Sequence, residues 1–216
     1  MSVKAFLEKL SLDDFFTHIF QAFFKWRVQS HSNDVLRNQA DVIICLSFGL
    51  RENDPGKSNR AMAHILEDLY ARYKLPVVSQ WEVADSAMIP QSAFLHIVRE
   101  PRPSDKAPGF LYKIINFFFT SKNNDSGNYL DTRECLAQAA EVCLPRGLRT
   151  TIIVAHHDHV WRVMKSAQKV GFRTLIPYAQ TNIYDEQSSQ KYTRGKWRFL
   201  PREALTRIFY ILKGWI

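Results

Sequence analysis

The segment Arg-Thr-Thr-Ile-Ile-Val-Ala at residues 149–155, followed by His-His-Asp-His at residues 156–159, decides the fold class. Its short apolar run is rich in β-branched residues, which predicts a strand buried on both faces. Apolar residues at helical spacing follow from Val160 to Val170, and Gly171 predicts the end of that helix. A strand that leads directly into a helix is typical of the crossover connections of a parallel sheet.

The same alternation extends in both directions along the chain. Residues 41–49, Asp-Val-Ile-Ile-Cys-Leu-Ser-Phe-Gly, predict another fully buried strand. Further strands are predicted at residues 75–79, 92–98 and 172–177, and helices at residues 60–73, 130–144 and 201–216. Pro201 is a suitable first residue for the last helix. The sequence therefore predicts the α/β class, with a mostly parallel sheet covered by helices on both faces.

Residues 1–40 precede this pattern and have a different composition. They predict an amphipathic helix followed by a connector over residues 29–40. The helix would pack on the domain's own core or on a partner, including a second copy of the chain, and membrane-surface binding is the alternative. Within the α/β domain of residues 41–216, three prolines and an apolar patch predict an insertion or lid at about residues 100–128. The apolar stripe of the N-terminal helix comprises Phe15, Phe16, Ile19, Phe20, Phe23 and Phe24.

Composition limits the classes of protein and of partner. A chain of 216 residues with 46% hydrophobic residues can bury one core, and its net charge of +8 favours an anionic partner or a solvated basic surface. No specific nucleic-acid partner is expected because no binding motif or long basic run occurs. No apolar run reaches the roughly 18 residues of a transmembrane segment. The three cysteines lack a short C-x-x-C spacing, which favours a cytoplasmic protein with reduced thiols.

Candidate site residues follow from the predicted sheet, because ligands bind beyond the carboxyl ends of parallel strands. Glu82 and His159 are the catalytic candidates at this edge. Thr132 and Glu134 begin the helix before the fourth strand, whose N-terminus is expected to point away from the edge unless the insertion bends it back. The ligand-binding candidates at the edge are Ser47, Gly49, Asn59, Arg60, Gln80, His156, His157 and Arg162.

The turn that leads to Arg162 predicts an anion site. Asp158 is expected to cap the helix, while the helix amides, His159 and Arg162 hold one anion. Residues 159 and 162 are three apart and share a helical face. The histidines could also satisfy buried hydrogen bonds. No metal site is predicted, because adjacent turn residues diverge and no established ligand spacing occurs.

The two glutamates and His159 could carry chemistry. Glu82 and Glu134 suit general acid or base catalysis, or the binding of a ribose or an amine, and His159 titrates near neutral pH. The alternative is that each carboxylate only interacts favourably with a helix N-terminus. No G-x-G-x-x-G, G-x-x-x-x-G-K-[ST] or G-x-S-x-G motif occurs, so no standard phosphate loop or α/β-hydrolase elbow is indicated.

Four short motifs follow one another along the chain: the strand at residues 41–46 with Arg60, Thr132 with Glu134, His159 with Arg162, and the closing Arg202 with Glu203. In this order they resemble the YdcF, SanA and ElyC family, a bacterial domain of undetermined general function. The match spans roughly residues 40–216. The chain departs from the family in its first loop, which is reduced to Ser-Phe-Gly, in its second loop, and at Cys135, where the family has Asn.

This resemblance implies a Rossmann-like three-layer sandwich and S-adenosylmethionine as the cofactor. It also implies that Thr132 and Glu134 are site residues. The first hypothesis is therefore a cytoplasmic binder, or enzyme, of a nucleotide-type or other anionic small molecule, with Arg60, His159 and Arg162 on the anionic group. The competing hypothesis is a non-catalytic protein-interaction or membrane-surface module that uses the N-terminal helix and the basic tail.

Overall fold

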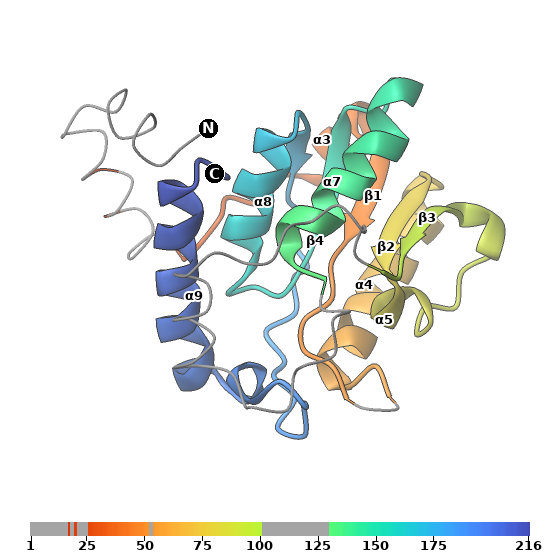
Figure 1. Ribbon diagram of the computed structural model, residues 1–216. Coiled ribbons are helices and arrows are strands. Elements are labelled where there is room, and N and C mark those ends of the chain that lie inside the picture. The colour runs from red at the N-terminus through yellow and green to blue at the C-terminus, as the bar shows by residue number, and fades with distance from the viewer. Residues whose placement is uncertain (1–16, 18–19, 21–25, 52–53, 101–129) are drawn as a thin grey trace.

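The computed structural model describes residues 17, 20, 26–51, 54–100 and 130–216 (Figure 1). The N-terminal helix expected over Phe15–Phe24 and the insertion expected at about residues 100–128 lie outside the described residues, apart from Thr17, Phe20 and Glu100.

A five-stranded, all-parallel sheet forms the centre of the molecule, with the order β3-β2-β1-β4-β5. The predicted α/β class is confirmed, and the arrangement is consistent with a Rossmann-like three-layer sandwich. β1 lies in the middle and pairs through Ile44 with Val78 of β2 and Ile153 of β4. Because the chain order reverses between β1 and β4, the topological switch point lies beyond their carboxyl ends. The strands are β1 Val42–Cys45, β2 Val77–Gln80, β3 Phe94–Val98, β4 Thr150–Val154 and β5 Arg173–Leu175.

Helices connect the strands, and the described residues contain no helix long and apolar enough to span a membrane. Three single turns of 3-10 helix supplement the α-helices at Gln91–Ala93, Leu144–Arg146 and Lys191–Arg194. The α-helices are α3 Asn33–Gln39, α4 Lys57–Tyr73, α5 Trp81–Ala84, α7 Thr132–Cys143, α8 Val160–Lys169 and α9 Lys196–Leu212.

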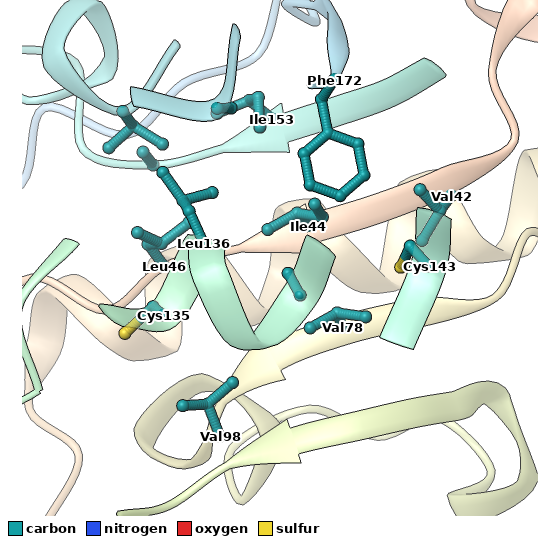
Figure 2. Packing of buried hydrophobic residues seen from close by; sticks show 14 of the residues in the cluster. Val42, Ile44, Leu46, Val78, Val98, Cys135, Leu136, Cys143, Ile153 and Phe172 are labelled. Carbon is teal, nitrogen blue, oxygen red and sulfur yellow. The ribbon is translucent and has the colours of Figure 1, made fainter. Parts of the chain in front are cut away.

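Both faces of the sheet are covered, which explains the continuous apolar runs of the strands. Helices α7 and α8 lie on one side of the sheet and α3 and α4 on the other (Figure 1). Alternate residues of β1 serve the two cores: Ile44 packs with Leu136 of α7, as Figure 2 shows, whereas Ile43 packs with Met62 of α4. The site therefore stands on a strand layer that is fixed from both sides.

Two local predictions were wrong. Residues 33–39 form a helix rather than a connector, because the Ser32 side chain accepts a hydrogen bond from Val35 and Leu36 is buried in the core. Helix α9 begins at Lys196, so Pro201 lies inside the helix. A proline near the start of a helix removes a single backbone hydrogen bond, and Phe199, buried in the first turn, packs in the core. Core packing thus outweighs the local signal in both places.

Candidate functional site

The N-terminus of α7 lies at the carboxyl edge of the sheet. The Thr132 hydroxyl is 3.1 Å from Nε2 of His159 and accepts a hydrogen bond from Nη1 of Arg162 at 3.0 Å. The expectation that this helix points away from the edge was wrong. A helix between parallel strands runs antiparallel to them, so it begins at the edge where the strands end.

Arg162 binds an anion of the same chain. Its Nε lies 3.1 Å from both carboxylate oxygens of Glu203, and its Nη2 lies 2.9 Å from Oε2. Arg207 binds the same carboxylate through Nε at 3.0 Å. All three side chains are almost fully buried. An external anion at Arg162 would therefore have to compete with Glu203, a residue that sequence reasoning noted only as part of the family's closing helix.

This ion network determines the charge state of its neighbours. Burial alone would raise the pKa of Glu203, but Arg162, His159 and Arg207 hold it well below its ordinary value. Burial, followed by the charge of Arg162, lowers the pKa of His159 to about 4 against the opposing effect of Glu203. His159 is consequently a neutral imidazole at physiological pH, and the expectation that its pKa lies near neutrality was wrong because burial and the adjacent guanidinium disfavour its charged form.

Asp158 does not cap α8, so this prediction was also wrong. The residue at the cap position is His159, whose side chain makes no capping hydrogen bond. The Asp158 carboxylate instead accepts a hydrogen bond from the Tyr184 hydroxyl at 2.6 Å. The backbone carbonyl of Asp158 accepts from Arg207, which ties this turn to α9.

A second carboxylate from the C-terminal segment, which we define as the residues after β5, lies at the start of α4. Asp185 accepts hydrogen bonds from the backbone N–H of Lys57 at 3.0 Å and from Nε and Nη2 of Arg51 at 2.8 and 2.7 Å. The hydrogen bonds from Arg51 are the main cause that lowers the pKa of Asp185. A helix N-terminus that follows the first strand is where a phosphate binds in many α/β proteins. Here a carboxylate of the chain lies at that position.

The loop after β1 is held by amide side chains. The backbone N–H of Ser47 donates to the Gln80 side chain at 2.8 Å, and that of Phe48 donates to Asn59 at 2.8 Å. Asn59 also donates to the carbonyl of Gly49. Gln80 and Asn59 thus position the loop, whereas Arg60 is exposed on α4 and pairs with Asp54.

Gly49 is required by its surroundings. Its φ is +74°, and an added Cβ would lie 2.7 Å from the Thr193 hydroxyl. Any other residue would be strained and would collide with this part of the C-terminal segment. Gly49 therefore brings the β1 loop and the C-terminal segment together.

Aromatic side chains fill the switch point between β1 and β4. The rings of Phe48 and His156 stack with centroids 3.8 Å apart, and Phe199 and Tyr184 contact Phe48 edge-on at 4.7 and 5.6 Å. His156 is fully buried, and burial lowers its pKa to about 3. His157 is only half-buried, and its backbone N–H donates to the carbonyl of Thr181.

Glu82 is one of two candidate site residues whose side chain has a buried polar atom without a hydrogen-bond partner among the described residues; the other is His156, through Nε2. Glu82 follows β2 directly in α5 and is 7% exposed, yet its Oε2 has no hydrogen-bond partner in the part of the chain that the structure describes. Burial raises its pKa to about 7, although a hydrogen bond with Ser47 acts in the opposite direction. A carboxyl group in this state can accept a hydrogen bond or exchange a proton near neutral pH.

Glu134 lies in the same region of the edge. It is buried, and its Oε1 accepts a hydrogen bond from Gln138 at 2.8 Å. Burial, and then the charges of Asp131, Glu82 and Glu134, raise the pKa of the Cys135 thiol, so both glutamates are close enough for their charges to act on it. Outside the undescribed segments, no group of three or more His, Cys, Asp or Glu side chains is placed to hold a metal ion.

The sequence candidates therefore separate into groups. The first surrounds Arg162 and comprises Thr132 and His159; the second comprises Ser47, Gln80 and Glu82 after β1 and β2. Comparisons of the chain with protein-family models, curated proteins and solved structures found no match.

Replacing Glu203 with Gln should strongly destabilise the protein. The amide keeps the shape of the side chain but leaves Arg162 and Arg207 without their buried counter-charge, which costs about 3–5 kcal/mol in comparable buried pairs. The free energy of unfolding in urea measures the loss. The matched Glu186→Gln, on an exposed side chain, should change it by less than about 0.5 kcal/mol. A loss below about 1 kcal/mol for Glu203→Gln would contradict this description of the network.

Acid should destabilise the protein through its two buried neutral histidines. The pKa values of His156 and His159, about 3 and about 4, lie below the ordinary 6.5, so the unfolded chain binds these protons first. The stability they support is complete above about pH 6.5 and is lost as the pH falls toward 4. His156→Phe should lower the slope of unfolding free energy against pH by about 1.4 kcal/mol per pH unit in this range, measured by urea unfolding.

The control for this slope is Met88→Leu, because the Met88 side chain is 84% exposed and carries no titratable group. It should leave the slope unchanged. If His156→Phe also left the slope unchanged, His156 would not be a buried neutral group in the folded protein.

Proposed function

We propose that this chain binds a nucleoside-type small molecule at the carboxyl edge of its sheet, with Glu82 accepting hydrogen bonds from ribose hydroxyls or an amino group. The single observation that carries the proposal is the buried Oε2 of Glu82, which lacks a partner among the described residues. Leaving such a group unpaired costs about 1–3 kcal/mol, and a ligand donor would recover this energy. Ligand binding would thus offset the free-energy cost of burying this carboxyl group without a partner.

The position of Glu82 supports the same ligand class. It follows β2, the neighbour of β1, in a sheet whose order reverses between β1 and β4. Sheets of this order bind nucleotides beyond the strand ends, and an acidic side chain there accepts from a ribose hydroxyl. Ser47, which hydrogen-bonds to Glu82, adds a hydroxyl group beside this carboxyl at the end of β1.

Charge favours a ligand with hydroxyl or cationic groups over a polyphosphate. Two positions suited to an anion, the start of α4 and the guanidinium of Arg162, already hold Asp185 and Glu203. The two acidic side chains close to Cys135 are those of Glu82 and Glu134, and their negative charge would instead attract a cationic group. The anionic ligand expected from the sequence would have to displace these internal carboxylates, so we place the ligand's polar contacts at Glu82.

S-adenosylmethionine has hydrogen-bond donors that match these carboxylate acceptors. It carries ribose hydroxyls and an amino group that Glu82 and Glu134 would hold, and its sulfonium centre supplies an electrophilic methyl group when it is bound. The resemblance to the YdcF, SanA and ElyC family suggests the same cofactor. Thr132 and His159 would border the site from α7 and α8, since both lie at this edge.

Glu82→Gln should weaken the binding of S-adenosylmethionine at least tenfold, which isothermal titration calorimetry would measure. The amide replaces one acceptor oxygen with a donor and removes the negative charge. The variant should remain folded at pH 8, since the raised pKa of Glu82 shows that its buried charged form opposes folding there. Loss of binding would then report on the site rather than on stability.

The matched control is Glu186→Gln, an exposed acid in the C-terminal segment, which should bind as the wild type does. Adenosine should compete with S-adenosylmethionine, because it presents the same ribose. Equal affinity in Glu82→Gln and the wild type would contradict the proposal, as would the absence of any binding of S-adenosylmethionine or adenosine.

A further inference from the structure

Helix α9 carries an apolar stripe on its outer side. The residues of this stripe are spaced by three or four positions along α9, so they share one face of the helix. Trp197 is 85% exposed and Leu205 is 40% exposed, whereas Ile208 and Leu212 are half-buried. α9 packs beside α8 at the margin of the molecule (Figure 1). We call this set the α9 stripe: Trp197, Pro201, Leu205, Ile208 and Leu212.

Cations surround the stripe. Lys196 and Arg198 flank Trp197 and are exposed. The segment of residues 191–216 contains one acidic residue, Glu203, and that carboxylate is fully buried between Arg162 and Arg207. The exposed part of this segment is therefore apolar and cationic, with no acidic side chain. Of the other cations of the segment outside the ion network, Lys191 is exposed and Arg194 and Lys213 are half-buried, whereas Arg202 is buried against the ring of Tyr192 and does not contribute to the exposed charge.

We propose that the α9 stripe docks on an anionic lipid surface, independently of the ligand proposed for Glu82. An apolar stripe with a tryptophan and flanking lysine or arginine is the pattern of a helix that lies in the plane of a membrane interface. Anionic lipid headgroups complement the cations, and the acyl boundary takes up the Trp197 and Leu205 side chains. A nucleic acid would engage the cations but would leave the apolar stripe in water.

Helix α9 is attached to the domain through its inner side, so only its outer side can contact a lipid surface. Its inner side is fixed through Phe199 in the core and Glu203 in the ion network. The outer stripe can therefore contact the surface of a bilayer without α9 leaving the domain, so binding is peripheral. Such binding depends on the density of anionic lipid and weakens as salt screens the charges.

Co-sedimentation of the full chain with lipid vesicles tests this proposal. The wild type should bind vesicles that contain phosphatidylglycerol more tightly than vesicles of phosphatidylcholine alone, and added salt should weaken that binding. The double variant Trp197→Ser/Leu205→Ser should bind at least tenfold more weakly. The control Met88→Ser/Tyr178→Ser, whose side chains are 84% and 90% exposed and belong to residues outside α9, should bind as the wild type does.

Three outcomes would overturn the proposal. The first is equal binding of the stripe variant and the wild type, which would move any lipid contact elsewhere on the chain. The second is equal binding to neutral and anionic vesicles. The third is a concentration-dependent dimer, seen by analytical ultracentrifugation without lipid and lost in the stripe variant, which would assign the stripe to a second copy of the chain.

Discussion

The buried ion pair between Arg162 and Glu203 is the interaction on which the rest of the site depends. It joins α8 to α9, and through Thr132 it also includes the start of α7. A buried charge left without its partner costs far more than an exposed one, so these elements hold one another in a single arrangement. Arg207 completes the network and ties it to the turn after β4.

This network also determines what the carboxyl edge can bind. Glu203 neutralises Arg162, and Asp185 lies at the start of α4, so the C-terminal segment supplies the anions that a nucleotide phosphate would otherwise supply. The aromatic stack of Phe48 on His156 lies just beyond the carboxyl ends of β1 and β4. Among the described residues at this edge, Oε2 of Glu82 and Nε2 of His156 are buried atoms without a hydrogen-bond partner. Because a carboxylate oxygen is an acceptor, the ligand that we propose is a nucleoside with hydroxyl and cationic groups rather than an anion.

The sequence predicted the layers of the fold better than the contacts of the site. Buried strands and amphipathic helices leave periodic patterns, so β1, β4, α4 and α8 could be located from residue types alone. The same patterns do not show which charges meet. Arg162 and Glu203 are 41 residues apart, and Arg51 and Asp185 are 134 apart. Such pairs follow from tertiary packing. The same holds for the position of Thr132 at the carboxyl edge and for the start of α9 at Lys196, five residues before Pro201.

The titration of the Glu82 carboxyl reports whether this side chain binds the proposed ligand. Carbon-13 NMR of the side-chain carboxyl groups, titrated with and without S-adenosylmethionine, would follow each glutamate separately, with Glu82→Gln providing the assignment. We expect one resonance, absent in that variant, to titrate at about pH 7 in the free protein and to change its midpoint when the ligand is present. A Glu82 resonance that titrates near the ordinary value of 4.5, with a midpoint that does not change when the ligand is added, would show that Glu82 is not the buried carboxyl that binds the ligand.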